Sequence, residues 1–383
     1  MDYIYFDNAA TTRTSDVVRE EMARAEVQLF YNSAAMYSPS LLVKNEITHA
    51  NETVKRRLCA MCIQSEEGEL IFTSGATESN NMVIFGKILN KQRHHLIVLS
   101  GEHSSVFAPA KYLKDNGFEV DFVPLHGDGT ADLDAVRRLV KPNTTLFVFG
   151  MVNSDTGCMQ NTREIVRIVR EINKGVHIHC DATQAFCKFN FDVQILGLDS
   201  VAICAHKING PKGIGALWIR NVDSVKATLH PIMLGGGQQP LRPGTENNPA
   251  VMGFAKAVET FDTEKNYTHV KKLYDRLVSN LPNGCTLNGN SPNPYIINIQ
   301  LPNILGQTVM NALSSVGICV GLGSACASTA AKNRTLLAMG IEEKKTKQVI
   351  RVSFGVYNTL EEVDRFLDEL KKILANLAVY KIK

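Results

Sequence analysis

Short apolar runs alternate with amphipathic stretches between residues 69 and 220. Between two of these runs, Ile165, Ile168 and Val169 recur at helical spacing among charged residues. Strands and helices that alternate in this way are typical of a mostly parallel sheet with helices on both faces. The strands that the pattern predicts are 69–73, 96–100, 146–150, 176–180 and 216–219.

The pattern changes after residue 220, where a second, smaller α+β unit is predicted. A glycine-rich loop at 235–244 closes the first region, and one long helical segment is expected from Pro249 to Leu281. Strands are predicted near 295–299 and 349–353. A C-terminal helix from Leu360 to about Ala378 is expected, because one face repeats apolar residues, namely Val363, Phe366, Leu367, Leu370 and Ile373.

Composition and charge are those of an ordinary globular protein. Hydrophobic residues make up 44% and charged residues 21% of the 383 positions. The net charge of +3 gives no reason to expect a nucleic acid or a membrane surface as partner. No apolar run reaches the roughly 18 residues of a spanning helix, and the N-terminus lacks a signal-peptide pattern. The nine cysteines are scattered and odd in number, so a reducing cytoplasm is expected.

Cys59 and Cys62 form a Cys-x-x-Cys pair after a helical pattern. A second cysteine pair or a histidine pair at ligand spacing is missing from the sequence, so zinc is not expected. The pair is interpreted as two buried small residues one helical turn apart. The other cysteines in apolar or strand-like surroundings are expected in the core, and these are Cys158, Cys180, Cys187, Cys285 and Cys319.

Asp181 and Lys207 have the order and spacing that an enzyme dependent on pyridoxal phosphate needs. In such enzymes the lysine forms a Schiff base with the cofactor, and the carboxylate keeps the pyridine nitrogen protonated so that the ring accepts electrons. A buried carboxylate is costly without a partner, and the pyridinium N–H supplies one. Lys212, in the turn 210–213, is interpreted as a turn residue.

The segment 73–81 follows a predicted strand and opens a helix. Its small residues let backbone amides approach an anion, and a helix N-terminus favours a phosphate. By itself, an ordinary strand-to-helix turn explains the segment equally well. His103 also follows a predicted strand. A histidine there is commonly a satisfied loop or core residue, but an imidazole suits proton transfer near neutral pH.

Arg351 and Cys326 supply the remaining candidate chemistry. Arg351 lies on an apolar strand, where it needs either a buried acid or a ligand, and its guanidinium suits a carboxylate. Cys326 lies among small residues at 320–331, so few side chains anchor this segment to a core. Such a loop could carry a nucleophilic thiol to an outside acceptor. The alternative is a buried cysteine in a small-residue turn.

Together these motifs resemble the cysteine desulfurases of the NifS/IscS type in the class V aminotransferase group, over almost the whole chain. The resemblance implies an α/β fold, that of the pyridoxal-phosphate-dependent transferases, with a mostly parallel sheet of the seven-stranded type. It implies a large domain at 16–259 and a smaller α+β domain at 1–15 and 260–383 that carries the Cys326 loop. It also implies a homodimer with a composite active site.

The resemblance further assigns roles to single residues. Lys207, Cys326 and His103 are implied to be catalytic, and His103 also stacks on the cofactor ring. Arg351 and Asn32 are implied to bind the substrate, and no metal is implied. The implied cofactor contacts are Ala76, Thr77, His103, Ser154, Asp181, Gln184, Cys204, His206, Lys207 and, from the neighbouring subunit, Thr245.

The implied reaction converts L-cysteine to L-alanine. The Cys326 thiolate takes the substrate sulfur as a persulfide, which then passes to a sulfur acceptor or scaffold protein for iron–sulfur cluster assembly or thiolation. The interval from Cys326 to Arg351 resembles that of the long-loop group of desulfurases, whose cysteine is mobile.

Four positions depart from the family pattern. The segment 32–37 lacks the usual proline, serines and histidine, Ser154 replaces an asparagine, Cys204 replaces a serine, and 331–334 lacks a proline. Each lost hydrogen bond is expected to weaken binding by about 0.5–1.5 kcal/mol. Two other functions stay open. One is a selenocysteine lyase or another class V lyase that does not need Cys326, and the other is a cofactor-binding scaffold protein that has lost turnover.

Overall fold

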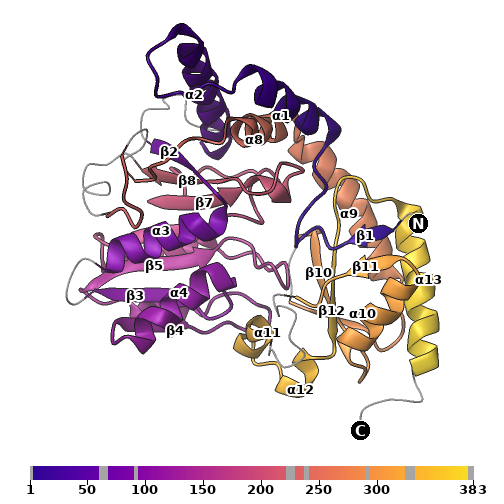
Figure 1. Ribbon diagram of the computed structural model, residues 1–383. Helices are drawn as coiled ribbons and strands as arrows, with labels where there is room; N and C mark the ends of the chain where they lie inside the picture. The colour runs from indigo at the N-terminus through magenta and orange to yellow at the C-terminus, as the bar shows by residue number, and fades with distance from the viewer. Residues whose placement is uncertain are drawn as a thin grey trace.

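The computed structural model describes residues 3–59, 68–89, 94–220, 229–236, 241–289, 293–323 and 333–377. Its larger part is built on one seven-stranded sheet (Figure 1). β8 is antiparallel to both of its neighbours, and the other neighbours pair in parallel. The mostly parallel sheet that the sequence predicts is therefore confirmed. Across the sheet the strands are β2 (Gly68–Thr73), β8 (Gly215–Arg220), β7 (Ser200–Cys204), β6 (His177–Asp181), β5 (Thr144–Gly150), β3 (His95–Leu99) and β4 (Glu119–Val123).

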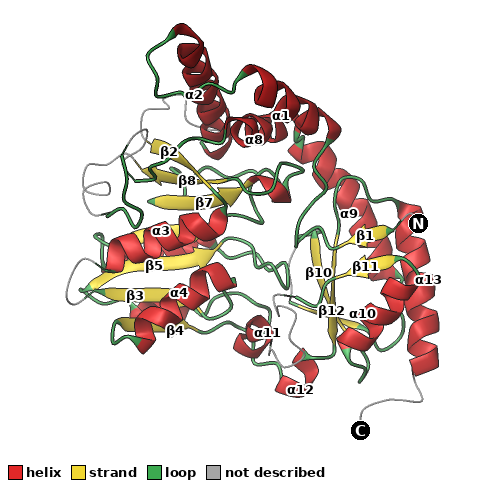
Figure 2. Ribbon diagram, in the orientation of Figure 1, coloured by secondary structure: helices red, strands yellow, loops and turns green. Residues whose placement is uncertain are grey.

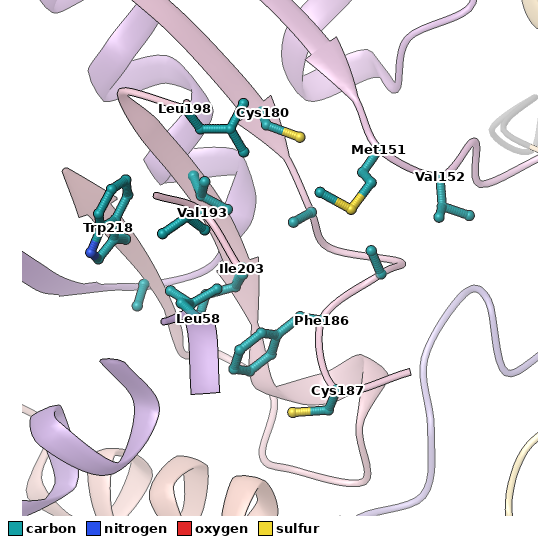
Figure 3. Close-up of a cluster of buried hydrophobic side chains, with 14 of the residues drawn as sticks. Leu58, Met151, Val152, Cys180, Phe186, Cys187, Val193, Leu198, Ile203 and Trp218 are labelled. Carbon is teal, nitrogen blue, oxygen red and sulfur yellow. The ribbon is translucent and has the colours of Figure 1, made fainter. Parts of the chain in front are cut away.

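Buried side chains cover both faces of this sheet. Val98 of β3 belongs to a cluster with α3 (Ala76–Ile88) and α4 (Ser104–Asp115), whereas its neighbour Ile97 belongs to a cluster with α6 (Thr162–Ile172). Successive strand residues point to opposite faces, which explains the division. Figure 3 shows part of the second cluster, where Phe186, Ile203 and Trp218 lie among aliphatic and sulfur-containing side chains.

Helices also cover the β2 edge of the sheet. α1 (Asp16–Gln28) and α2 (Ser38–Leu58) both pack against α8 (Asn248–Thr260), and α2 also contacts β2 (Figure 2). The expected single helix from Pro249 to Leu281 is wrong. α8 ends at Thr260, and Phe261 follows it as the C-cap. Asp262 then caps a new helix by accepting a hydrogen bond from the backbone N–H of Lys265.

The smaller α+β unit has an antiparallel sheet, ordered β12-β10-β9, and a separate parallel pair, β1 with β11. The pair joins the N-terminal strand to a strand more than 300 residues later in the chain. The predicted boundaries at 16–259 remain a prediction. The elements are β1 (Ile4–Phe6), β9 (Thr286–Asn288), β10 (Ile296–Gln300), β11 (Ile318–Val320), β12 (Val349–Ser353), α9 (Thr263–Ser279), α10 (Gly306–Ser315), α11 (Arg334–Ala338), α12 (Glu343–Thr346) and α13 (Leu360–Leu377).

The C-terminal helix is confirmed, because the predicted apolar face of α13 is buried against the second unit. Two cysteine predictions are wrong, since Cys285 and Cys319 are only half-buried beside the core. α2 ends at Leu58, and the buried Cys59 pairs with Asp192 in an isolated β-bridge. Cys62, the other half of the predicted pair, lies outside the described residues.

None of the helices in the described part of the chain is long and apolar enough to cross a membrane. In the same residues, no cluster of three or more His, Cys, Asp or Glu side chains is arranged to hold a metal ion. The remaining helix of the larger part, α5 (Leu133–Leu139), packs against α6 and β4.

Candidate active site

A cavity of about 600 Å³ opens where β5, β6 and β7 end. Loops that follow the carboxyl ends of parallel strands meet at one edge of a sheet, and α/β proteins bind ligands there. Most of the residues predicted from the sequence line this single cavity. They are Ala76, Thr77, His103, Ser154, Asp181, Gln184, Cys204, His206, Lys207 and Arg351.

Asp181 is the last residue of β6 and is 8% exposed. Its Oδ1 accepts a hydrogen bond from the backbone N–H of Thr183 at 2.9 Å, and its Oδ2 accepts one from Nδ2 of Asn80 at 2.8 Å. A carboxylate only accepts hydrogen bonds and has about four lone-pair positions. Two donors from the protein leave Asp181 able to accept a further N–H from a ligand in the cavity.

Lys207 lies in a short 3-10 turn, η2 (Ala205–Lys207), and its side chain is buried. Its Nζ donates to the backbone carbonyls of Ala9 at 2.5 Å and Ala10 at 2.6 Å. Burial lowers the pKa of Lys207 from its ordinary value, because the charged ammonium loses hydration. The two carbonyls can take both hydrogens of a neutral amine, whose lone pair then remains for a carbonyl carbon in the cavity.

His103 precedes α4 and caps its first turn. Its Nδ1 lies 3.2 Å from the backbone N–H of Ser105 and 2.9 Å from the Ser105 hydroxyl. Burial lowers the pKa of His103, although the nearby Asp181 carboxylate opposes this shift. The imidazole is therefore neutral near pH 7 and able to exchange protons with a ligand.

The start of α3, which also lines the cavity, suits an anion. Ala76 and Thr77 form the first turn of α3, whose leading N–H groups have no acceptor within the helix. His206 lies beside Thr11, with Nδ1 and Oγ1 3.1 Å apart, and burial lowers its pKa to about 4. The hydroxyl of Thr183, which also lines the cavity, is buried without a hydrogen-bond partner among the described residues.

Arg351 reaches the cavity from β12 of the smaller unit. Its Nη2 donates to Asp7 at 2.7 Å, its Nη1 donates to the carbonyl of Ser154 at 2.9 Å, and Asp155 lies 3.8 Å away. The sequence predicts either a buried acid or a ligand as the partner of Arg351. An acid is present, and it lies beside the cavity without filling it. The Nε–H is buried with no partner in the described part of the chain, which leaves a donor for a ligand.

Gln184 lies between two lysines. Its Nε2 donates to the carbonyl of Ala9, and its Oε1 accepts from Nζ of Lys188 at 3.0 Å. Lys188 is buried, and burial together with the nearby Lys207 lowers its pKa to about 7. Cys204 is buried at the end of β7, and burial raises the pKa of its thiol to about 11.

Three predicted residues are not placed at this cavity. Asn32 and Thr245 lie together at a second pocket of about 330 Å³, between the end of α1 and the start of α8. Cys326 lies outside the described residues. Within one chain, Asn32 is therefore not brought to Arg351, and the contribution of Thr245 from a neighbouring subunit stays a prediction.

Two residues at the site were missed by the sequence analysis. Asn80, inside the helix-opening segment, contacts Asp181 directly. Glu102 accepts a hydrogen bond from the backbone N–H of Gly150 at 2.8 Å, and burial raises its pKa to about 8. The only sequence signal for Glu102 is its position next to His103. A polar residue after a strand is too common for that position to assign Glu102 to the site.

The family model described as aminotransferase class-V matches residues 4–366. The chain belongs to this family. It is 35% identical to cysteine desulfurase IscS 1 of Archaeoglobus fulgidus, over 97% of each chain. It is also 35% identical to the mitochondrial cysteine desulfurase of Saccharomyces cerevisiae, over 94% of this chain and 73% of the yeast protein.

Solved structures give the same result. A NifS-like protein superposes with a TM-score of 0.89 at 33% identity, covering 98% of this chain and all of that chain. A structure titled SspA in complex with cysteine gives 0.81 at 28% identity, covering 93% of this chain and all of that chain. The resemblance to the NifS/IscS-type desulfurases and the predicted fold class are confirmed.

Pyridoxal phosphate, on which this family depends, fits the residues present. The first turn of α3, with its leading N–H groups, suits its phosphate. The Asp181 carboxylate suits a pyridinium N–H, and Lys207 offers an amine of lowered pKa. These match the chemical groups of the cofactor one by one.

We expect Asp181→Asn to retain the cofactor but to lower turnover of L-cysteine by roughly 100-fold, or about 2.7 kcal/mol of transition-state stabilisation. An amide nitrogen or a neutral amide oxygen cannot hold a proton on the ring nitrogen as a carboxylate does. Steady-state kinetics at saturating pyridoxal phosphate measures the effect. Asp192→Asn is the matched control, because Asp192 is a buried aspartate that caps a turn outside the cavity. Near-normal turnover of Asp181→Asn would mean that this acid serves another purpose.

Proposed function

We propose that this protein is a pyridoxal-phosphate-dependent cysteine desulfurase that converts L-cysteine to L-alanine and carries the sulfur as a persulfide on Cys326. The observation that supports it most is that Asp181, Lys207 and Arg351 line one cavity although they come from distant parts of the chain. Relatives that match nearly the full chain are named cysteine desulfurases, which favours this activity over a scaffold without turnover.

Arg351 binds and orients the substrate carboxylate. Its Nε–H has no partner in the described residues, and its Nη2 is shared with Asp7 at the cavity wall. A guanidinium gives a planar set of donors that matches a carboxylate. The substrate carboxylate therefore fixes the amino acid by one end, with its amino group and Cα directed toward Lys207 and His103.

Lys207 and His103 move the proton of the substrate Cα. Burial lowers the pKa of both groups, which favours the uncharged forms that accept a proton. The bound cofactor supplies an electron sink for the pair of electrons that this proton leaves behind. Asp181 keeps that sink effective by holding a proton on the ring nitrogen.

Cys326 takes the sulfur. Its thiolate forms an S–S bond to the substrate sulfur while the substrate C–S bond breaks, and the electrons of the C–S bond stay with the carbon, which is protonated to give alanine. The product sulfur is then a persulfide on Cys326. Brief exposure of the wild-type protein to L-cysteine should add one sulfur to the peptide that contains Cys326, as read by mass spectrometry. An added sulfur on the Cys204 peptide instead would contradict the proposal.

Arg351→Lys tests the substrate end of the site. We expect the KM for L-cysteine to rise by roughly 10- to 100-fold with a smaller change in kcat. Hydrogen bonds to a charged group contribute about 1.5–3 kcal/mol, and a lysine cannot form the bidentate pair of hydrogen bonds that a guanidinium forms with a carboxylate. Arg220→Lys is the control, since Arg220 is a half-buried arginine at the far end of β8. An unchanged KM would assign the carboxylate to other residues.

The same proposal includes a homodimer. Large apolar side chains are exposed between the end of α1 and the start of α2, with Phe30 at 67%, Met36 at 97% and Leu42 at 54%. Asn32 and Thr245 lie together at the adjacent pocket. Burial of this surface by a second copy would bring both residues toward a neighbouring site. Sedimentation equilibrium should give twice the mass of one chain.

The sulfur acceptor is proposed to be a scaffold or carrier protein of iron–sulfur cluster assembly or thiolation, as the family implies. The protein is proposed to act in the cytoplasm. The odd number and scattered positions of the nine cysteines in the sequence support a reducing compartment. Neither proposal involves a nucleic acid or a membrane as direct partner.

A further inference from the structure

Three polar residues alternate along β6 and face α3. His177, His179 and Asp181 are separated by Ile178 and Cys180, whose side chains lie in the apolar cluster on the opposite face of the sheet. Imidazoles inside a sheet are expensive unless their nitrogens are hydrogen-bonded. Both histidines are at most 5% exposed, so their partners come from the protein.

These partners form one continuous chain of hydrogen bonds that ends at Asp181. Nε2 of His177 lies 2.7 Å from the hydroxyl of Ser200, and the same hydroxyl lies 2.8 Å from Nδ1 of His179. Nε2 of His179 lies 2.9 Å from Oδ1 of Asn80, whose Nδ2 donates to Asp181. Ser200 and Asn80 are fully buried, as is His179.

The Asp181 carboxylate at the end of this series fixes which group donates and which accepts in each hydrogen bond. The Asp181 carboxylate only accepts, so the amide nitrogen of Asn80 faces it and the amide oxygen faces His179. His179 must then carry its proton on Nε2, and its bare Nδ1 accepts from the Ser200 hydroxyl. The Ser200 oxygen in turn accepts from Nε2–H of His177. Nδ1 of His177 has no partner among the described residues, which agrees with a bare nitrogen.

A second branch leads from Asn80 to His103. The Nδ2 group of Asn80 also donates to the hydroxyl of Ser105 at 2.9 Å. Since that oxygen accepts from Asn80, its own hydrogen is available to Nδ1 of His103. The backbone N–H of Ser105 points at the same Nδ1. Nδ1 of His103 is thus an acceptor, and its ring proton belongs on Nε2.

We propose that Asn80 and His179 are positioning residues that hold the Asp181 carboxylate toward the cavity and, through Ser105, fix the ring proton of His103 on Nε2. One N–H of Asn80 donates to Asp181, and the other donates to Ser105, which contacts His103. One buried amide therefore sets the geometry of both Asp181 and His103. Burial lowers the pKa of His179 to about 4, which keeps the imidazole neutral near pH 7, and its hydrogen bonds to Ser200 and Asn80 select the tautomer. This inference deepens the proposed function and rests on it for the roles of Asp181 and His103.

Two measurements on the full-length protein test the proposal. In long-range proton–nitrogen NMR spectra of histidine-labelled protein, His179 and His177 should both show the neutral tautomer protonated on Nε2, and should not titrate between pH 6 and pH 9. Single substitutions assign the signals, because the chain has only ten histidines. A His179 protonated on Nδ1 would overturn the proposal, since the Asn80 oxygen would then have to face Asp181.

The second measurement is the affinity for pyridoxal phosphate, determined by equilibrium dialysis. Asn80→Leu and His179→Leu should raise the dissociation constant by roughly 10-fold, because the carboxylate loses a charge-assisted hydrogen bond or its oriented donor. His179→Gln should stay within about 2-fold of wild type, since a glutamine Nε2 can replace the imidazole Nε2–H as donor to Asn80.

Asn173→Leu is the control for the loss of a hydrogen-bonded asparagine, and Asn173 is half-buried. Asn173 donates to the carbonyls of Lys141, Pro142 and Thr144 at the opposite end of β5, so its loss removes several hydrogen bonds without touching the cavity. If both leucine variants at 80 and 179 keep wild-type affinity, the positioning role is wrong. If either leucine variant fails to fold, the positioning role is tested by the histidine tautomers of the wild type and by the affinity of His179→Gln for pyridoxal phosphate. Failure of the wild type to turn over L-cysteine would contradict the proposed function while leaving the tautomer result unchanged.

Discussion

Lys207→Ala should abolish turnover of L-cysteine, with a loss of roughly 1000-fold or more, and should remove the covalent attachment of pyridoxal phosphate. Lys207 is the buried amine at the centre of the cavity, and its pKa is lowered by burial. No other amine is both buried and directed at the space beside Asp181 in the described part of the chain. Visible absorbance of the bound cofactor and mass spectrometry after borohydride reduction measure the attachment.

Lys212→Ala provides the control for Lys207→Ala. Lys212 also lines the cavity, but its side chain is exposed in the turn after Pro211. An exposed lysine keeps its charge and is a poor nucleophile at neutral pH. The Lys212 variant should therefore retain the borohydride-stable attachment at the peptide that contains Lys207. Attachment that survives in Lys207→Ala would assign the role to another lysine.

The central strands could be predicted from the sequence because their apolar runs are continuous. β3, β5 and β8 are buried on both faces, which requires such runs. β6 is also buried on both faces, but its histidines and Asp181 alternate with apolar residues. β4 was missed because it is an edge strand in which polar residues alternate with apolar ones. β7 was missed because Ser200, Ala202 and Cys204 are small, and a five-residue run of this kind has no clear period.

The site could be predicted only where its residues stand in local motifs. Asp181, Lys207 and His103 each follow a strand in a recognisable sequence. The contact between Arg351 and Asp7 joins residues 344 positions apart, and the carbonyls of Ala9 and Ala10 carry no side-chain signal. Such contacts depend on how the N-terminal segment returns to the cavity, and no local pattern encodes that path.

Two of the departures from the family pattern disturb the site less than their side chains suggest. Ser154 contacts Arg351 through its backbone carbonyl, so the replacement of an asparagine leaves this hydrogen bond in place. Cys204 is buried, and the pKa of its thiol is raised to about 11, so it remains a neutral thiol near pH 7. A thiol of this kind is a weak nucleophile, which leaves sulfur transfer to another cysteine.

Cys326→Ala should still bind pyridoxal phosphate and L-cysteine, because Lys207, Asp181 and Arg351 are unchanged, but it should lose sulfur transfer by roughly 1000-fold. The variant has no thiolate placed to take the substrate sulfur, and the neutral thiol of Cys204 cannot replace it. Alanine formation and sulfide release under a reducing agent, compared with the wild type, measure the loss. Cys285→Ala is the control, since Cys285 is half-buried in the smaller unit away from the cavity.

The result for selenocysteine separates the remaining alternatives. Selenium leaves carbon more readily than sulfur, so a site that retains Lys207, Asp181 and Arg351 could release it without a thiolate. If Cys326→Ala turns over selenocysteine but not cysteine, the thiol is needed for sulfur alone, as the desulfurase proposal requires. If the same variant also forms alanine from L-cysteine at the wild-type rate, the persulfide step is wrong and the chain acts as a class V lyase. The absence of an added sulfur on the Cys326 peptide in the wild type would lead to the same conclusion by an independent measurement.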